Sequence, residues 1–439
     1  MKFEFWTSRG VTHIRARFDE DDNPIGRRQE GPGTEIQYLG EDILFDYEVK
    51  EIHPDILGLI CLLIFYPFIG KRAEFPIAVS PRLKEAFSNS NFKRQFEFVN
   101  IDPSVPIYHG SKMALSFGGG IDSSSVRVMF PEVFVVHEGH IKNAISVRKN
   151  GLWNKIIPSF MSQKELKGDL VPSHAHDVVK SLGSDNARLV VTNQRYVSQP
   201  GGWHGWPCST ITTLLLATDM NFGMVLTGTI IGSTMLSNGN AFWDRLHARQ
   251  HHGPSGNFWQ STFDSIGIPM FSPVLGASEF QTMALSNSLI QAGDVVYCME
   301  DKGNACNKCT KCLRRDVIRT VIDSTHNPVW DNYNRSEIHS FLLKRPLYFG
   351  HIFSYAISKS NSLPSFISDR LTEIPSISTD WPMKFYKESF ELCPEDWRGV
   401  IQDRVLNFIE PMNSKEVEEL KNWSQTRDNG HTGPVNVTD

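Results

Sequence analysis

Apolar and polar residues alternate in short runs over the first fifty residues of the chain. Such alternation is typical of half-buried strands, and it occurs in Lys2–Trp6, Thr12–Phe18 and Ile43–Val49. A continuous apolar stretch, Ile56–Ile69, follows. Because it is shorter than the roughly 20 residues that cross a bilayer and is interrupted by Pro67, it predicts a buried core helix. A second helix is expected near Pro81–Ser88.

The pattern changes after residue 105, where short apolar runs begin to alternate with segments of helical periodicity. The apolar runs are Lys112–Phe117, Val133–His137, Arg188–Thr192 and Met224–Thr227. Helical spacing is present in Ser123–Met129 and Ser209–Met220. Strands that alternate with helices favour an α/β fold with a doubly wound parallel sheet, and this region is the candidate catalytic core.

The last third of the chain reads as mainly helical, with candidate helices at Ser336–Leu343 and Asp396–Ile409. The stretch from Asn413 onward is polar and is expected to be a mobile tail. Trp243–Gln260 lacks periodicity and predicts a long loop of functional interest. We therefore expect an N-terminal, β-rich α+β domain over 1–105, a catalytic domain over 106–324, and a helical C-terminal extension with a polar tail over 325–439.

Composition and charge narrow the classes of function. The chain of 439 residues is 40% hydrophobic and 21% charged, which is ordinary for a globular protein. Its net charge of −5 offers no general basic surface, so a nucleic-acid partner is not expected. The first residues show no basic head followed by an apolar core. These features predict a cytoplasmic protein without a membrane partner.

Four of the seven cysteines fall within fifteen residues, at Cys298, Cys306, Cys309 and Cys312. A tight cluster with two CxxC steps indicates a metal site in a reducing compartment rather than a disulfide framework. Four thiolates suit tetrahedral Zn²⁺ and leave no open position, so the predicted zinc is structural. An iron–sulfur cluster is the alternative. Four nearby cations would offset the charge of the sulfurs: Lys308, Lys311, Arg314 and Arg315.

Residues 113–126 read MALSFGGGIDSSSV, an apolar strand that runs into three glycines and then a helix start. Glycines bring backbone N–H groups close to an anion, and a helix N-terminus adds unsatisfied donors and partial positive charge. The hydroxyls of Ser123 and Ser124 would add donors. Asp122 would be repelled by phosphate unless it holds Mg²⁺ or orients the loop. An ordinary glycine-rich turn between strand and helix is the alternative interpretation.

This loop resembles the SGGxDS phosphate loop of the N-type ATP pyrophosphatases, with Gly119–Ser123 in register. Gly118 stands where that family has serine, and Ser116 lies two residues earlier. The resemblance implies that ATP and Mg²⁺ bind here, with Asp122 and Ser123 in catalytic roles. The residues implied to hold the nucleotide are Ser116, Gly118, Gly119, Gly120, Ile121, Asp122, Ser123, Ser124, Thr227 and Gly228.

The loop and the cysteine spacing together are similar to those of the QueC family, the 7-cyano-7-deazaguanine synthases. The resemblance covers about 110–320 and includes the strand end Val225–Gly228 and the segment Ile268–Glu279 before the cysteines. It implies an adenine nucleotide alpha hydrolase-like (HUP) fold. Longer QueC-like proteins with such flanking extensions occur in bacterial antiphage systems, including the Qat type, and this chain looks more like those than like the housekeeping enzyme.

The reaction implied by this resemblance has two steps. A substrate carboxylate attacks the α-phosphorus of ATP and releases pyrophosphate, and a nitrogen nucleophile then displaces AMP. In the QueC family the acid is 7-carboxy-7-deazaguanine and the nucleophile is ammonia. For the defence relatives, an amine of a partner protein is the hypothetical acceptor. The protein's part is to position the reactants and to stabilise charge on the phosphates.

Candidate substrate residues lie near the expected carboxyl edge of the sheet, where ligands of open α/β sheets bind. Trp203 and Trp206 are placed to stack on a flat base, Arg195 to meet a carboxylate, and Arg245 to close over the substrate from the long loop. Ordinary packing of the two tryptophans is the alternative.

Two other functions stay open at this point. The first is tRNA modification, by thiolation or lysine addition, as other N-type pyrophosphatases perform it; thiolation would require a reactive cysteine, for which Cys208 is the candidate. The second is a nucleotide-binding scaffold subunit that has lost catalysis through the change at Gly118.

Overall fold

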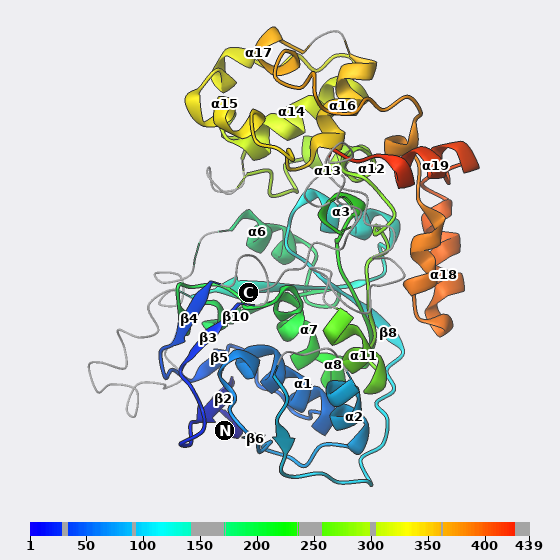
Figure 1. Ribbon diagram of the computed structural model, residues 1–439. Helices are drawn as coiled ribbons and strands as arrows, with labels where there is room; N and C mark the ends of the chain where they lie inside the picture. The colour runs from blue at the N-terminus through cyan, green and yellow to red at the C-terminus, as the bar shows by residue number, and fades with distance from the viewer. Residues whose placement is uncertain are drawn as a thin grey trace. The chain divides into compact units, whose positions relative to one another are not determined.

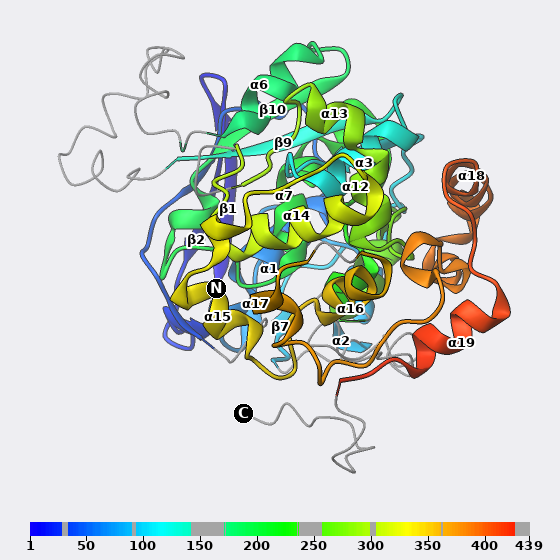
Figure 2. The same ribbon diagram turned by 90° about the horizontal axis from the view of Figure 1, so that it is seen from above.

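The computed structural model describes residues 1–28, 34–89, 94–141, 171, 173–234, 236, 257–298, 304–360 and 363–425 (Figures 1 and 2). The chain forms two compact units, each built from separate segments. Unit 1 consists of Met1–Gly118, Glu132–Leu226 and Gln250–Met270. Unit 2 consists of Gly119–Pro131, Thr227–Arg249 and Phe271–Asp439. The two units are described separately.

Unit 1 is built on a large sheet with the strand order β1-β2-β5-β10-β9-β8-β12-β13. Its strands are β1 (Lys2–Ser8), β2 (Val11–Arg17), β5 (Ile43–Phe45), β8 (Lys112–Ser116), β9 (Phe134–His140), β10 (Ala187–Thr192), β12 (Phe222–Leu226) and β13 (Met270–Phe271), of which Met270 lies in unit 1. The central pairs β10/β9, β9/β8 and β8/β12 are parallel, whereas β1/β2, β2/β5 and β5/β10 are antiparallel. The expected parallel sheet is confirmed at its centre.

The strands β1, β2 and β5 do not form a separate N-terminal sheet. Phe45 of β5 pairs with Thr192 of β10, so β5, β2 and β1 continue the parallel sheet on one side. An unpaired edge strand exposes a row of backbone N–H and C=O groups, and β5 covers that edge of β10. These three N-terminal strands are therefore part of the large sheet. The domain boundaries expected from the sequence stay a prediction.

Helices cover both faces of this sheet. They are α1 (Pro54–Phe65), α2 (Pro81–Asn89), α6 (His174–Ser181), α7 (Ile211–Leu215), α8 (Ala217–Met220) and α11 (Asn257–Ser265), with 3-10 turns η1 (Tyr66–Phe68), η2 (Gln194–Tyr196) and η3 (Trp206–Thr210). Helix α6 packs on β9 and β10, and α7 packs on β8 and β9 from the opposite face (Figure 1). Two small sheets, β11-β4-β3 and β6-β7, complete the unit; their strands are β3 (Ile25–Arg27), β4 (Glu35–Tyr38), β6 (Arg72–Ala73), β7 (Glu97–Phe98) and β11 (Ser198–Gln199).

The apolar stretch after residue 55 forms the predicted core helix. Every residue of α1 from Asp55 to Phe65 is buried. No helix within the described parts of the chain is both long and apolar enough to cross a membrane. The single helix expected over Ser209–Met220 is instead divided into η3, α7 and α8. The Ser209 and Thr210 hydroxyls donate to the carbonyls of Trp206 and Pro207, which competes with a regular helical ladder at this end.

Unit 2 is mainly helical in its described part. It contains α3 (Ile121–Met129), α9 (Ile231–Thr234), α12 (Glu279–Leu285), α13 (Asn287–Gln291), α14 (Thr310–Ile322), α15 (Ser336–Leu342), α16 (Gly350–Lys359), α17 (Ser365–Ser368), α18 (Glu395–Leu406) and α19 (Ser414–Asn422), with 3-10 turns η6 (Trp330–Tyr333), η7 (Trp381–Met383) and η8 (Lys387–Leu392). Helix α12 packs against α3, α14 and η7, and Figure 2 shows it beside α3 and α14. It begins with a capping box in which Ser278 and Gln281 satisfy each other's backbone N–H groups.

The polar stretch from Asn413 was expected to be a mobile tail, and this expectation was wrong for its first part, which forms α19. Asn413 and Glu416 form a capping box that starts α19. Trp423 is buried, and its indole Nε1 donates to the carbonyl of Pro375 at 3.0 Å. Residues 426–439 lie outside the described residues, as do residues 243–256 of the expected long loop.

A buried position of α1 provides a test of the core. Ile60 is fully buried, and Ile77 in the same unit is 42% exposed. Replacing Ile60 with alanine should reduce the free energy of unfolding by about 2–5 kcal/mol because it removes buried methyl groups and leaves a cavity. Urea unfolding, followed by circular dichroism, measures this change. The matched Ile77→Ala variant should shift the midpoint far less, and equal shifts would contradict the buried placement of α1.

Candidate functional site

The glycine loop lies where β8 leads into α3, and open space adjoins two of its glycines. Gly119 has φ of +74°, a left-handed conformation that glycine adopts without strain. A Cβ atom added at Gly118 or Gly120 would meet nothing within 4 Å. Gly118 is exposed, and Gly119 accepts a hydrogen bond from the N–H of Val296 at 2.7 Å. A ligand can therefore approach the main chain of this loop closely.

Helix α3 starts at Ile121, with Gly120 as its N-cap. The first N–H groups of a helix have no partner within the helix, so they are donors for an anion. The Ser123 hydroxyl donates to the carbonyl of Gly120 at 3.1 Å and lies at this first turn. Ser124 is fully buried. Of the two serines expected to contact phosphate, Ser123 is thus the one whose hydroxyl lies at the loop.

A second predicted segment, Thr227–Gly228, meets the start of α3. A Cβ atom on Gly228 would lie 2.6 Å from the backbone nitrogen of Ser123, so only glycine permits this approach. The N–H of Thr227 donates to the carbonyl of Phe271 at 3.0 Å, and the Ser272 hydroxyl donates to the carbonyl of Thr227 at 2.9 Å. The structure therefore brings together two segments that lie about a hundred residues apart in the sequence.

In unit 1, two side chains hold the strand end that enters the glycine loop. The Ser116 hydroxyl donates to the carbonyl of Ser209 at 2.8 Å. His137 lies at 2.6 Å from the carbonyl of Phe117 through Nδ1. Burial lowers the pKa of His137 to about 4, so its imidazole is neutral at physiological pH and donates from Nδ1. The sequence analysis assigned no role to His137. The signal that could have found it is its position as the polar residue at the end of the apolar run Val133–His137.

The side chain of Asp122 lies in a cavity of about 110 Å³ within unit 2. Its Oδ1 accepts a hydrogen bond from the Thr282 hydroxyl at 2.7 Å. Burial raises the pKa of Asp122, while the Thr282 bond and the charges of Arg315 and Lys311 act in the opposite direction. Asp122 was expected either to hold Mg²⁺ or to orient the loop. Its hydrogen bond with Thr282 joins α3 to α12 and fits the second role.

Three cations of α14 line the same cavity: Lys311, Arg314 and Arg315. Burial lowers the pKa of each of them. The Arg314 guanidinium lies 3.9 Å from the ring centroid of Phe349. Glu279 of α12 is the second carboxylate of the cavity, and it accepts from His351 Nε2 at 2.9 Å. Three cations against two carboxylates make this cavity suitable for an anion.

The sequence analysis linked these cations only to the cysteines. The structure shows that they also interact electrostatically with Asp122. Glu279 and Thr282 were not assigned any role. The Ser278–Gln281 capping pattern could have located their helix, but no local signal places that helix next to α3.

The four predicted metal ligands come together. The sulfur atoms of Cys298, Cys306, Cys309 and Cys312 all lie within 4.8 Å of one another. Two sulfur–sulfur distances are 3.6 Å (Cys298–Cys309) and 3.7 Å (Cys306–Cys312). A tetrahedron with Zn–S bonds of about 2.3 Å has edges of about 3.8 Å, so the cluster fits a metal ion such as zinc. Cys309 also caps α14, and its sulfur accepts from the N–H of Cys312.

The predicted substrate residues have different surroundings. In unit 1, the Arg195 guanidinium lies 5.2 Å above the ring of Trp203, whose centroid is 5.8 Å from that of His140. Glu138 lies beside His140, with a carboxylate oxygen 3.2 Å from Nδ1. Trp203 and Trp206 are both partly buried and pack against the hydrophobic core, as the packing alternative predicts. Arg245 lies outside the described residues.

Cys208 has a buried environment in unit 1. It is 2% exposed, and its thiol donates to the carbonyl of Leu63 at 3.1 Å. A thiol that transfers sulfur needs access to its substrates and a thiolate-favouring environment. This position therefore does not favour the thiolation alternative.

Part of the chain is similar to a known family model. The model of a family of unknown function (DUF6395) matches residues 258–424. This range contains the cysteine cluster and α14 but not the glycine loop. No curated protein and no solved structure matches the chain.

The cysteine cluster predicts a measurable metal content. The purified chain should contain about one zinc ion, as a four-cysteine site holds a single tetrahedral ion. Cys312→Ser should lose most of this metal because it removes one of four ligands. Cys393→Ser changes a buried cysteine outside the cluster and should retain it. Inductively coupled plasma mass spectrometry reads the metal directly, and a Cys312→Ser protein with undiminished zinc would exclude the cluster as its site.

Proposed function

We propose that this protein is an ATP-dependent enzyme that adenylates a carboxylate, releases pyrophosphate, and transfers the activated acyl group to a nitrogen nucleophile. One observation carries the proposal: the glycine loop at the start of α3 meets Thr227–Gly228 beside a cavity lined by three cations. Backbone donors, a helix N-terminus and buried positive charge together form an environment suited to a polyphosphate.

The order of the parallel strands supports this proposal. Numbered from β8 along the chain, the sheet of β8, β9, β10, β12 and β13 has the order 3-2-1-4-5. In open α/β sheets, ligands bind outside the carboxyl ends of the strands where the strand order reverses. Here the reversal falls between β8 and β12, and these two strands lead into the glycine loop and into Thr227–Gly228. The HUP fold implied by the resemblance is part of the same proposal.

In this proposal the phosphates of ATP lie on the main-chain N–H groups of Gly119–Ser123. The open space at Gly118 and Gly120 admits the phosphate oxygens, and Lys311, Arg314 and Arg315 counter their charge. Asp122 holds the first turn of α3 through Thr282. The Mg²⁺ that accompanies ATP supplies additional charge neutralisation at the phosphates.

The chemistry consists of two displacements. A carboxylate oxygen of the substrate forms a bond to the α-phosphorus as the bond to pyrophosphate breaks, which gives an acyl adenylate. A nitrogen nucleophile then forms a C–N bond, loses a proton, and displaces AMP. The proposed substrate class is a heteroaromatic acid similar to 7-carboxy-7-deazaguanine, and the acceptor is ammonia or an amine of a partner protein. A role in antiphage defence belongs to this proposal through the QueC-like resemblance alone.

The metal has a structural role in this scheme. A zinc ion on four cysteines has no position for substrate or water, so it takes no part in the displacement. Because Cys309 and Cys312 lie in the cap and first turn of α14, the metal holds the end of the helix from which Lys311, Arg314 and Arg315 project.

The decisive experiment measures pyrophosphate release from ATP and Mg²⁺ with 7-carboxy-7-deazaguanine, and identifies the products by mass spectrometry. Asp122→Asn should reduce the rate at least about tenfold, because the charge balance at the phosphates and the first turn of α3 both change. Asp403→Asn alters an exposed carboxylate of α18 and should leave the rate unchanged. Binding of ATP without any pyrophosphate release would overturn the enzymatic proposal and favour the scaffold alternative.

A further inference from the structure

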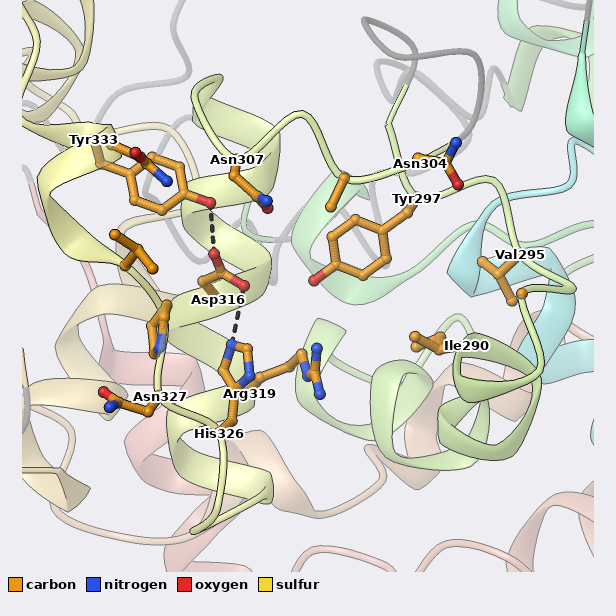
Figure 3. A pocket seen from close by; sticks show the side chains of 15 residues that line it. Ile290, Val295, Tyr297, Asn304, Asn307, Asp316, Arg319, His326, Asn327 and Tyr333 are labelled. Carbon is orange, nitrogen blue, oxygen red and sulfur yellow. Dashed lines mark hydrogen bonds and ion pairs between the residues drawn. The ribbon is translucent and has the colours of Figure 1, made fainter.

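A second, larger cavity lies on a different side of α14, also within unit 2. Its volume is about 450 Å³, and Figure 3 shows the side chains that line it. Asp316 and Arg319 come from α14, and Tyr297 precedes the cysteine cluster in the chain. Asn304 and Asn307 belong to the segment that carries the cysteines, so one wall of the cavity is part of the metal-binding loop. Ile290 and Val295 provide an apolar side.

Asp316 organises the polar wall of this cavity. One carboxylate oxygen lies 3.0 Å from His326 Nε2, and the other accepts from the Tyr333 hydroxyl at 2.5 Å. A carboxylate only accepts hydrogen bonds at neutral pH, so Nε2 of His326 carries a proton. Both oxygens of Asp316 are thus used in holding its neighbours, and this carboxylate is not the group that receives a ligand.

Tyr297 contributes a buried hydroxyl that has no hydrogen-bond partner among the residues that the structure describes. The residue is 8% exposed, and its hydroxyl points into the cavity (Figure 3). A tyrosine hydroxyl is protonated at physiological pH, so it offers one hydrogen-bond donor. The Arg315 guanidinium lies 4.6 Å from the ring centroid and fixes the ring. A buried polar group without a partner is costly, and a ligand atom at this position would satisfy it.

Arg319 supplies the cationic group of the cavity. Its nearest carboxylate is that of Asp323, at 3.7 Å, which is an ion pair longer than a hydrogen bond. The planar guanidinium presents five N–H donors in a fork that matches a carboxylate. Asp323 lies beside this guanidinium and Asp316 lines the same cavity, so a doubly charged anion would be repelled more than a singly charged one.

We propose that this cavity binds a small organic molecule through a single carboxylate group. The carboxylate lies on Arg319 and accepts from the Tyr297 hydroxyl, the asparagine amides bond to polar substituents, and the body of the molecule packs on Ile290 and Val295. The negative charges of Asp316 and Asp323 favour a singly charged carboxylate over a phosphate dianion. This binding needs neither ATP nor the glycine loop, and it stands or falls independently of the proposed adenylation.

Calorimetric titration of the full, metal-loaded chain without ATP tests the proposal, with nicotinate as the probe. Nicotinamide is its neutral isostere, and inorganic phosphate is the competing anion. Nicotinate should bind at least about tenfold more tightly than nicotinamide, as expected for charge-assisted hydrogen bonds. Arg319→Gln should remove this preference, and Tyr297→Phe should weaken nicotinate binding about threefold to tenfold while the ring packing is kept.

Arg335→Gln is the matched control, because Arg335 is exposed and does not line the cavity. It should bind nicotinate as the parent chain does. Thermal unfolding and zinc content establish that each variant is folded. The proposal is overturned if nicotinate does not bind, if phosphate binds more tightly, or if folded Arg319→Gln keeps the preference for nicotinate over nicotinamide.

Discussion

Buried charge around Asp122 is the constraint on which unit 2 depends. Asp122 and Glu279 lie in one cavity with Lys311, Arg314 and Arg315, and burial shifts the pKa of Asp122 and of each cation toward its neutral form. Charged groups removed from water are tolerated only when they are paired and hydrogen-bonded. Asp122 is hydrogen-bonded to Thr282 and Glu279 to His351, and the three cations of α14 interact electrostatically with Asp122, so these charges contribute to the packing of α3, α12 and α14.

The cysteine cluster supports the same arrangement at the N-terminal end of α14. Cys309 caps the helix and Cys312 lies in its first turn, interleaved with Lys311, Arg314 and Arg315. These cations interact with the sulfurs of Cys298, Cys309 and Cys312 as well as with Asp122. A metal at the cysteines would therefore hold the helix that presents positive charge to Asp122. The same helix can therefore carry a ligand of a structural metal and the cations of an anion site.

The sequence predicted the features that depend on neighbouring residues. The strands over Lys112–Phe117 and Arg188–Thr192 and the core helix after Asp55 follow from local patterns of burial, and the cysteine ligands follow from their spacing. The contact of Thr282 with Asp122 joins residues 160 positions apart, and the pairing of Phe45 with Thr192 extends the sheet across a similar distance. No local pattern encodes such contacts, because they result from how the formed elements pack.

Helical geometry explains how α14 serves two cavities. Successive residues are rotated by about 100°, so Lys311, Arg314, Arg315 and Ile318 fall on one side. Asp316 and Arg319 fall on another and line the larger cavity. Arg315 belongs to the first group, yet its guanidinium also stacks on Tyr297, a wall of the second. The position of one buried cation is thus set by the charge of Asp122 on one side and by the ring of Tyr297 on the other. An anion bound beside Asp122 would interact with the Arg315 guanidinium, which also fixes the phenol ring of Tyr297. The two cavities lie on different faces of the helix, yet the charge of Arg315 affects both of them.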